Sequence, residues 1–258
     1  MSGYSVSDLL HQQSGRCIQS DSQLIELVAS SEATRIQTVN LHHLSLCESS
    51  TEFERSFLSA NFITADGWPV VKALGWMGLK VERVTGASFV EHLTYAPILE
   101  DLPLGLLGAT TQAGDRWSAM LSDANKRLVF RDHGHHTSWS AKDIVRAAQQ
   151  AGVRLLLVAV TPPVGDNLAR EILAAGYSGV IISVGGAIDM VTGIRPRAPK
   201  HVQLLGLEWA HRLISDPRRL FRRYFIECVP VLLKLSPLAA IHYVQRARYK
   251  KGSGVRSG

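Results

Sequence analysis

Two nearly continuous apolar runs, residues 153–160 and 180–184, each follow a segment with helical spacing, and this alternation constrains the fold most strongly. Residues 140–152 begin with a serine that is typical of a helix N-cap and end in a glycine, and residues 167–176 also end in a glycine. Strands that are apolar on both faces belong to parallel sheets that helices cover from both sides. The sequence therefore predicts an α/β fold with a parallel sheet.

Further strands are predicted at residues 35–41, 59–69, 104–109 and 127–130, and a further helix at residues 115–126. The second of these strands ends in a loop marked by glycine and proline. Ligands in such folds bind beyond the carboxyl ends of the strands. By that rule the candidate site collects polar strand ends and loops: Thr38, Asn40, Asp66, the loop at Gly134, and residues 161–163 and 185–189.

A chain of 258 residues with 46% hydrophobic residues can bury one large core. Cys17, Cys47 and Cys228 form neither an even disulfide framework nor a C-x-x-C motif, so we expect a reducing compartment. The N-terminal residues lack the features of a secretory signal. No stretch reaches the ~20 uninterrupted apolar residues of a transmembrane helix, since Lys234 interrupts the nearest one, residues 228–244. We therefore expect a cytoplasmic protein that does not span a bilayer.

Positive charge is concentrated at the C-terminal end. From Arg212 onward there are eleven Lys and Arg residues and two Asp and Glu residues, a net charge of +9, whereas the whole chain carries +6, which leaves −3 for the residues before it. Such asymmetry indicates an anionic partner for this end: phospholipid, diphosphate or nucleic acid.

The basic segment also has a helical pattern. It predicts a short helix at residues 205–214 and a second helix with Asp216 as its N-cap and Pro217 at its first position, continuing over residues 221–235. The apolar residues recur at helical spacing beside arginines: Phe221, Phe225, Val229 and Leu232. This pattern is typical of a basic amphipathic helix, and a solvated helix packed on the sheet domain is the alternative.

Ser236 and Pro237 are expected to interrupt that helix. Residues 238–251 then combine an apolar patch with a cationic rim, which favours the interface of an anionic membrane. The expected organisation is a catalytic α/β domain (1–205), a C-terminal basic helical appendage (206–251) and a disordered Gly/Ser/Arg tail (252–258).

Asp66 follows an apolar strand and precedes a glycine that permits a tight turn, so its carboxylate can accept a proton from a substrate hydroxyl. An N-cap or turn aspartate is the alternative. Thr38 and Asn40 lie two residues apart on a strand and would point the same way, as a donor and acceptor pair for a sugar or uracil edge. Hydrogen bonding at the strand end explains the pair equally well.

Gly185 and Gly186 follow a strand, so their backbone N–H groups can approach a diphosphate, and Asp189 can bond a ribose hydroxyl. The chain has no dinucleotide-binding or P-loop glycine motif. It also has no Asp-x-Asp pair for a metal-chelated sugar nucleotide, so arginines would have to neutralise the leaving diphosphate. The histidine clusters at 42–43 and 133–136 lack zinc-ligand spacing.

These segments together resemble the WecG/TagA/CpsF family of bacterial glycosyltransferases. The longest agreement runs over residues 183–200 and 205–224. Earlier family motifs are matched, in the same order, by Thr38-Val-Asn40, Ala65-Asp-Gly-Trp-Pro69 and Arg83-Val-Thr-Gly86, so the resemblance covers roughly residues 30–230.

The resemblance implies an inverting enzyme that needs no metal and no cofactor. Such an enzyme moves a hexosyl or N-acetylhexosaminyl group from a nucleoside-diphosphate donor, expected to be a UDP-sugar, to a polyprenyl-diphosphate-linked sugar in surface polysaccharide biosynthesis. The implied fold is a Rossmann-like sheet of the GT-E type, with an appendage that closes over the site. The implied place of action is the cytoplasmic face of the bacterial plasma membrane, with no nucleic acid as partner.

The same resemblance assigns roles to particular residues. It implies Asp66 as the catalytic base and Arg212, Arg219 and Arg222 as the arginines that face the leaving or lipid diphosphate. The implied substrate and nucleotide residues are Thr38, Asn40, Thr85, Gly86, Asp166, Gly185, Gly186 and Asp189.

One loop departs from the family pattern. Where the family reads Gly-Ala-Pro-Lys-Gln-Glu, residues 161–166 read Thr-Pro-Pro-Val-Gly-Asp, so glycine replaces the glutamine beside the donor sugar and Asp166 takes the glutamate position. Sugar specificity therefore does not carry over. A family member with reduced or lost activity and a nucleic-acid-binding α/β protein are the alternatives, and self-association stays open.

Overall fold

The computed structural model describes residues 4–134, 138–204 and 207–253, and it contains one seven-stranded sheet in which every pairing is parallel. The strand order is β1-β3-β2-β7-β6-β4-β5, so the chain order reverses where β2 and β7 adjoin. The strands are β1 (Cys17–Ile18), β2 (Thr34–Val39), β3 (Phe62–Ala65), β4 (Leu104–Gly108), β5 (Leu128–Asp132), β6 (Leu155–Ala159) and β7 (Val180–Ser183).

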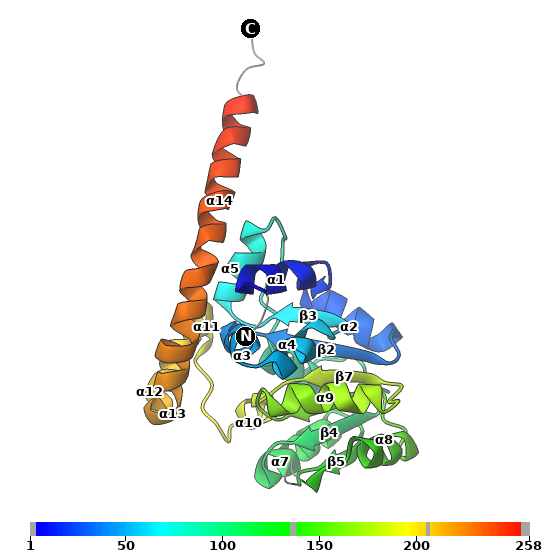
Figure 1. The fold of residues 1–258 in the computed structure, drawn as a ribbon. Helices are drawn as coiled ribbons and strands as arrows, with labels where there is room; N and C mark the ends of the chain where they lie inside the picture. The colour runs from blue at the N-terminus through cyan, green and yellow to red at the C-terminus, as the bar shows by residue number, and fades with distance from the viewer. Residues whose placement is uncertain (1–3, 135–137, 205–206, 254–258) are drawn as a thin grey trace.

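Helices cover both faces of this sheet and extend beyond it at the C-terminal end (Figure 1). In the first half of the chain they are α1 (Val6–Ser14), α2 (Asp21–Ser30), α3 (Leu41–Ser49), α4 (Thr51–Leu58), α5 (Trp68–Trp76), α6 (Gly86–Tyr95) and α7 (Thr111–Asp123). In the second half they are α8 (Ala141–Gln150), α9 (Val164–Ala174), α10 (Ala187–Val191), α11 (Lys200–Leu204), α12 (Glu208–Ser215), α13 (Pro217–Phe221), the π-helix η2 (Arg222–Cys228) and α14 (Val229–Ser253).

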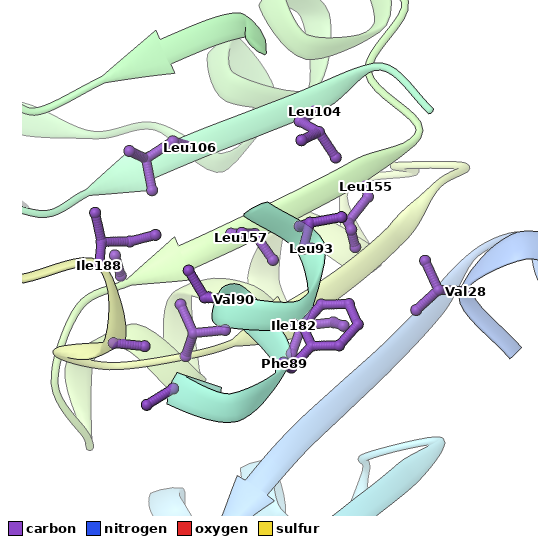
Figure 2. Packing of buried hydrophobic residues seen from close by; sticks show 14 of the residues in the cluster. Val28, Phe89, Val90, Leu93, Leu104, Leu106, Leu155, Leu157, Ile182 and Ile188 are labelled. Carbon is purple, nitrogen blue, oxygen red and sulfur yellow. The ribbon is translucent and has the colours of Figure 1, made fainter. Parts of the chain in front are cut away.

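The apolar strands bury side chains on both faces, as their continuous hydrophobicity predicts. On one face, Phe89, Val90 and Leu93 of α6 pack against Leu106 of β4 and Ile182 of β7 (Figure 2). Each such side chain contributes about 1.5–3 kcal/mol when it is fully buried. On the other face, α8 and α9 cover β6 and β7, and α3, α4 and α5 cover β2 and β3. The predicted Rossmann-like α/β fold with a C-terminal helix is therefore confirmed.

The predicted strands recur within a few residues of their expected bounds. The loop expected after Gly67 is wrong, because α5 begins at Trp68 and Pro69 occupies its first turn, where its missing N–H costs no helical hydrogen bond. The helix expected at residues 115–126 begins earlier, at Thr111, because the Thr110 hydroxyl caps it by accepting from the N–H of Ala113.

The interruption expected at Ser236 and Pro237 is also wrong, since α14 continues through both residues. Proline leaves the carbonyl four residues earlier without its helical donor. That carbonyl belongs to Leu233, and the Ser236 hydroxyl donates to it at 2.7 Å. The helix reaches Ser253, so the expected tail begins too early, and residues 254–258 lie outside the described residues.

The helix expected at residues 205–214 is described from Glu208, because residues 205 and 206 lie outside the described part. The next helix begins at Pro217 as expected, but Asp216 makes no side-chain cap hydrogen bond.

The inner face of α14 is buried, and its outer apolar face is not. Val231 and Leu235 are fully buried in the core that α1, α3 and α5 share, and Lys234 forms an ion pair with Glu48 of α3 at 2.5 Å. The stripe noted in the sequence is exposed, and so are its apolar neighbours: Phe221, Phe225, Ile226, Val229, Leu232 and Leu233.

This exposed face bears on the sequence-based expectation that nothing spans a bilayer. The stretch Arg222–His242 is, by length and composition alone, long and apolar enough to cross a membrane. Most of its residues are not buried inside the protein. Uninterrupted apolar length and mean hydropathy differ here, because Glu227 and Lys234 interrupt the apolar run while the mean hydropathy over 18 residues stays high.

Candidate active site

A cavity of about 600 Å³ opens at the carboxyl ends of β2, β3, β6 and β7. This is where the strand order reverses, the usual ligand position in open α/β sheets. Residues of α12, α13, η2 and α14 form its outer wall, so the C-terminal segment closes over the strand ends. Most of the residues expected at the site lie on this cavity: Thr38, Asn40, Asp66, Thr85, Asp166, Gly185, Gly186 and Arg212.

Asp66 extends from the end of β3 into the cavity. Its backbone N–H donates to the carbonyl of Val39 at 2.8 Å, and Gly67, with φ of 135°, turns the chain away into α5. Burial raises the pKa of Asp66 above its ordinary 3.8, and Glu208 adds to this rise, while Arg212, His43 and Arg83 oppose it. Among the described residues its carboxylate has no hydrogen-bond or ion-pair partner, so it is free to accept a proton from a ligand.

Glu208, in the first turn of α12, lies near Asp66 and accepts hydrogen bonds from two arginines. Arg83 donates to its Oε2 at 3.0 Å and Arg212 donates to its Oε1 at 2.5 Å. Burial acts to raise the pKa of Glu208, but the two arginines lower it below the ordinary 4.5. Arg83 comes from the segment before α6, so this carboxylate ties the C-terminal segment to the body of the protein.

The carboxylates of Glu208 and Asp66 also keep the Arg212 guanidinium positively charged. Burial alone would lower the pKa of Arg212, yet Glu208 and Asp66 raise it above its ordinary value. The guanidinium therefore stays charged on the cavity wall, where an anionic leaving group would need it.

Asn40 is held by its own helix. Its side-chain oxygen accepts from the N–H of His42 at 3.0 Å and caps α3, while its backbone N–H donates to Nδ1 of His43 at 3.2 Å. His43 in turn places Nε2 3.4 Å from a carboxylate oxygen of Asp166 in α9. Both this histidine and Asp166 are buried on the cavity wall, so the first turns of α3 and α9 are joined there.

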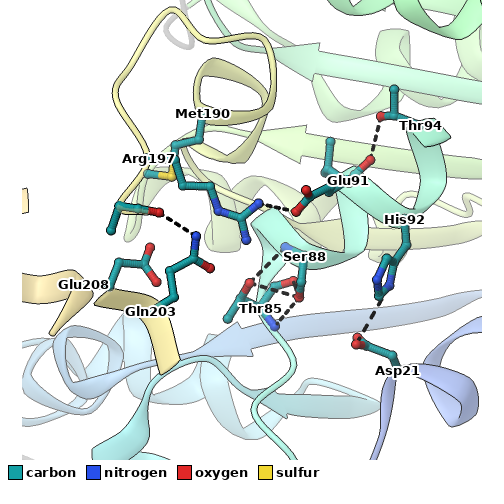
Figure 3. Close-up of polar contacts among 12 residues, drawn as sticks. Asp21, Thr85, Ser88, Glu91, His92, Thr94, Met190, Arg197, Gln203 and Glu208 are labelled. Atoms are coloured by element: carbon teal, nitrogen blue, oxygen red, sulfur yellow. Dashed lines mark hydrogen bonds and ion pairs between the residues drawn. The ribbon is translucent and has the colours of Figure 1, made fainter. Parts of the chain in front are cut away.

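The other expected substrate residues have structural roles as well. The Thr38 hydroxyl donates to the carbonyl of Ser183 at 2.9 Å and links β2 to β7. Thr85 and Ser88 cap α6 by reciprocal hydrogen bonds, seen in Figure 3. Gly86 does not line the cavity: a Cβ there would lie 3.1 Å from the backbone of Val184, so glycine lets α6 approach β7.

The chain after β7 forms the opposite wall. Gly185 has φ of 54°, which glycine adopts readily, and it lies on the cavity with Gly186. Asp189 is not on the cavity wall: it pairs with Arg195 at 3.4 Å, and the Thr110 hydroxyl donates to it at 3.5 Å. Arg195 itself reaches the cavity, a position that sequence reasoning missed because the residue lies beyond the glycine pair.

Two of the three arginines expected to face diphosphate, Arg212 and Arg222, are not brought together. Arg212 is on the cavity, whereas the side chain of Arg222 is 79% exposed and lies 3.7 Å from Glu227. The side chain of Arg219 lies outside the described residues. Arg223 lines the cavity instead of Arg222, because the wider turn of η2 sets which face of this segment points inward.

Aromatic and apolar side chains form part of the cavity wall. Trp68 of α5 and Trp209 of α12 line it with Phe225 and Leu232, and the Trp209 ring meets Tyr224 edge to face at 6.2 Å. Arg197 forms an ion pair with Glu91 of α6 and thereby ties the chain after α10 to the body of the protein (Figure 3). Aromatic rings with adjacent polar groups suit a sugar face or an isoprenoid.

No three His, Cys, Asp or Glu side chains gather as a metal site within the described residues, which omit His135 and His136. The histidines at 42 and 43 are engaged with Glu227 and Asp166, respectively.

Comparison with protein families gives one match over most of the chain. The model of the family described as "Glycosyl transferase WecG/TagA/CpsF family" matches residues 17–245. The match extends beyond residues 30–230, over which the sequence showed its resemblance, and includes both the cavity and most of α14. The resemblance inferred from the sequence is therefore confirmed.

Proposed function

The chain belongs to the WecG/TagA/CpsF family of glycosyltransferases, and on that premise we propose that it is an inverting enzyme in which Asp66 is the catalytic base. The proposed donor is a UDP-sugar, and the proposed acceptor is the hydroxyl of a sugar linked to polyprenyl diphosphate. The transferred group is a hexosyl or N-acetylhexosaminyl residue of a cell-surface polysaccharide.

The observation that carries the proposal is the unpaired Asp66 carboxylate beside the partly buried arginines Arg83 and Arg212. Its raised pKa makes it a stronger base than an ordinary aspartate. The other carboxylates discussed on the cavity wall are engaged: Glu208 by Arg83 and Arg212, and Asp166 by His43. An available carboxylate that acts as a general base suits one displacement with inversion, whereas retention by double displacement would need a carboxylate nucleophile against the anomeric carbon.

In the proposed reaction Asp66 takes the proton of the acceptor hydroxyl while the oxygen of that hydroxyl attacks the anomeric carbon of the donor sugar. The bond from that carbon to the diphosphate breaks on the opposite face, and its electron pair leaves with the nucleoside diphosphate. Arg212 and Arg223 on one wall, and Arg195 on the other, lie where they can offset the charge of the diphosphates. Gly185 and Gly186 are the proposed place of approach for the nucleotide.

Substitution of the base tests the reaction. Asp66→Asn should lower kcat about 100- to 10,000-fold with UDP-sugars and a polyprenyl-diphosphate-linked acceptor, because general base catalysis contributes that much. Asp143→Asn, at an exposed position on α8, is the matched control and should keep full activity. Near-normal transfer by Asp66→Asn would show that another group takes the proton.

We propose further that the protein acts at the inner surface of the bacterial plasma membrane, as a lipid-linked acceptor requires. The exposed apolar side chains of η2 and α14 lie close to the cavity mouth, with Arg218 and Arg222 exposed beside them. Such a face suits the interface of an anionic membrane. A spanning position would withdraw Val231 and Leu235 from the core, so an interfacial position costs less.

Flotation with vesicles that contain phosphatidylglycerol tests the membrane proposal. The double variant Phe225→Ser and Leu233→Ser should lose most of the binding, because two exposed apolar anchors are removed. Tyr95→Ser, which removes an exposed ring from α6, is the matched control and should float like the natural protein. Natural protein that stays with the soluble fraction would show that this face is not a membrane surface.

A further inference from the structure

Trp68, the first residue of α5, lies on the wall of the substrate cavity with much of its ring uncovered. The residue is 37% exposed, whereas Trp117, which packs in the core, is 0% exposed. Its indole N–H donates to the carbonyl of Gln203 in α11 at 3.5 Å, which satisfies the polar edge of the ring. The rest of the ring is apolar, and covering it with a ligand is favourable because apolar surface leaves water.

The turn after β3 keeps this ring close to the proposed base. Gly67 is the only residue between Asp66 and Trp68, and its φ of 135° is one that side-chain-bearing residues rarely adopt. Two consecutive trans peptides span at most about 7.6 Å between the Cα atoms of Asp66 and Trp68. Since both residues line the same cavity, a ligand whose hydroxyl reaches Asp66 lies beside Trp68.

The strand order indicates which substrate that ligand is. Asp66 follows β3, the glycine pair at 185 and 186 follows β7, and β2 lies between these two strands. An inverting displacement brings the acceptor hydroxyl to the anomeric carbon on the face opposite the leaving diphosphate. With the nucleotide at the glycine pair, the acceptor sugar is on the Asp66 side of the donor, where α5 begins.

The chemistry of this wall suits such an acceptor. A pyranose ring has a face of C–H groups that packs on a flat aromatic ring, while its hydroxyls project from the edge and stay free to react. Phe225, Val229 and Leu232 line the same cavity and are exposed, which suits the isoprenoid part of the acceptor. We propose, on the basis of the function proposed above, that Trp68 stacks on the acceptor sugar and selects hexoses or N-acetylhexosamines that present an open C–H face.

Steady-state transfer to soluble acceptors tests this role of Trp68. The probes are farnesyl-diphosphate-linked hexoses and N-acetylhexosamines, used without vesicles, with the UDP-sugar that the natural protein accepts. Trp68→Leu keeps an apolar side chain but has no flat ring, so KM for the acceptor should rise about tenfold. Trp68→Phe keeps a flat ring, so KM for the acceptor should stay within about threefold of the natural value. In both variants kcat and KM for the UDP-sugar should change less than about twofold, because only acceptor binding is affected.

The two variants also separate stacking from a structural role. Both lack the indole N–H that donates to Gln203, so a contribution from that hydrogen bond would appear equally in both. Tyr95→Leu is the matched control, because it removes an exposed ring of α6 that is not among the residues lining the cavity, and it should leave both KM values unchanged.

The outcomes distinguish this proposal from the proposed function. An unchanged acceptor KM in Trp68→Leu, or equal rises in Trp68→Leu and Trp68→Phe, would overturn the stacking role while leaving a functional transferase. A rise in KM for the UDP-sugar alone would show that the ring stacks on the uracil, and a loss seen only with vesicles would show a membrane anchor; either would overturn it too. Natural protein that transfers sugar to no acceptor of the panel would overturn the proposed function, and the role of Trp68 with it.

Discussion

The carboxylate of Glu208 joins the C-terminal segment to the sheet domain. Glu208→Gln should therefore loosen that segment and also lower the pKa of the proposed base, Asp66. The natural side chain is 12% exposed and receives one hydrogen bond each from Arg83 and Arg212. Glutamine has the same shape but no charge and only one acceptor oxygen. The variant therefore leaves one arginine without its partner and removes the counter-charge of both.

The magnitude follows from these contacts. A hydrogen bond to a charged group contributes about 1.5–3 kcal/mol, and breaking a buried ion pair costs about 3–5 kcal/mol. Because Arg212 is 37% exposed, solvent screens part of the loss, and we expect a decrease of about 2–3 kcal/mol in the free energy of unfolding. For a domain of about this size, that lowers Tm by roughly 4–12 °C.

The pH dependence of this loss has a definite direction. The pKa of Glu208 in the folded protein lies below its ordinary 4.5, so its stabilising contribution is present above about pH 4.5 and is lost as the pH falls through the folded-state pKa. The difference in Tm between the natural protein and Glu208→Gln should therefore narrow in acid. Glu208 also raises the pKa of Asp66, so the acid limb of kcat/KM should move to lower pH in the variant.

Thermal unfolding from a pH below the folded-state pKa of Glu208 up to pH 8, and a pH profile of transfer, would measure both effects. Glu171→Gln is the matched control, because Glu171 is 53% exposed and pairs only loosely with Arg170 at 3.9 Å. Such a surface pair contributes about 0.2–1 kcal/mol. If Glu208→Gln melts no earlier than Glu171→Gln, the carboxylate does not hold the C-terminal segment on the sheet domain. An acid limb that moves to higher pH would refute the assigned effect of Glu208 on Asp66.

Three other properties follow from burial. Leu235→Ala, on the fully buried face of α14, should lower the free energy of unfolding in urea by about 2–5 kcal/mol, whereas Leu233→Ala, at a position 65% exposed, should change it by less than ~0.5 kcal/mol. Equal losses would contradict the docking of α14. Burial raises the pKa of the Cys17 thiol to about 12, so iodoacetamide at pH 8 should leave it unmodified in the folded protein, and rapid labelling found by mass spectrometry would contradict its burial. Burial lowers the pKa of His42 to about 3, below the ~6.5 of the unfolded chain, so its neutral form contributes stability that is lost as the pH falls below ~6.5. His42→Gln should reduce the decline of Tm between pH 6.5 and pH 4. An NMR titration in which the His42 resonance has its midpoint near pH 6.5 would refute this.

Local signals predicted much of the sheet and several helices. The run at residues 153–160 is apolar on both faces because β6 is covered on both faces, and Gly152 and Gly176 follow α8 and α9 with positive φ of 71° and 96°. These features depend on residues within a few positions of one another, so they can be recognised from the sequence alone. The helix through Pro237 was missed although its cause is local, because whether the Ser236 hydroxyl donates to the Leu233 carbonyl is decided only in the folded backbone.

For the same reason, the strand-end residues of the candidate site were predicted from the sequence, whereas its arginines were predicted only in part. Strand ends place Thr38, Asn40 and Asp66, since the carboxyl ends of parallel strands meet at one edge. The arginines were harder, because the π-helical turn of η2 directs Arg223 inward and leaves Arg222 in solvent. Helical periodicity alone does not reveal a π-helical segment.

What the sequence by itself determined was the parallel α/β sheet, its strand ends and a basic amphipathic C-terminal segment, because apolar periodicity and capping residues act over short distances. Only the tertiary structure decided which side chains share the cavity. The order β3-β2-β7 puts Thr38 beside Ser183, and the docking of α12 puts Glu208 against Arg83, 125 residues earlier in the chain. Contacts of this kind depend on sheet order and helix packing, which join segments that are far apart in sequence.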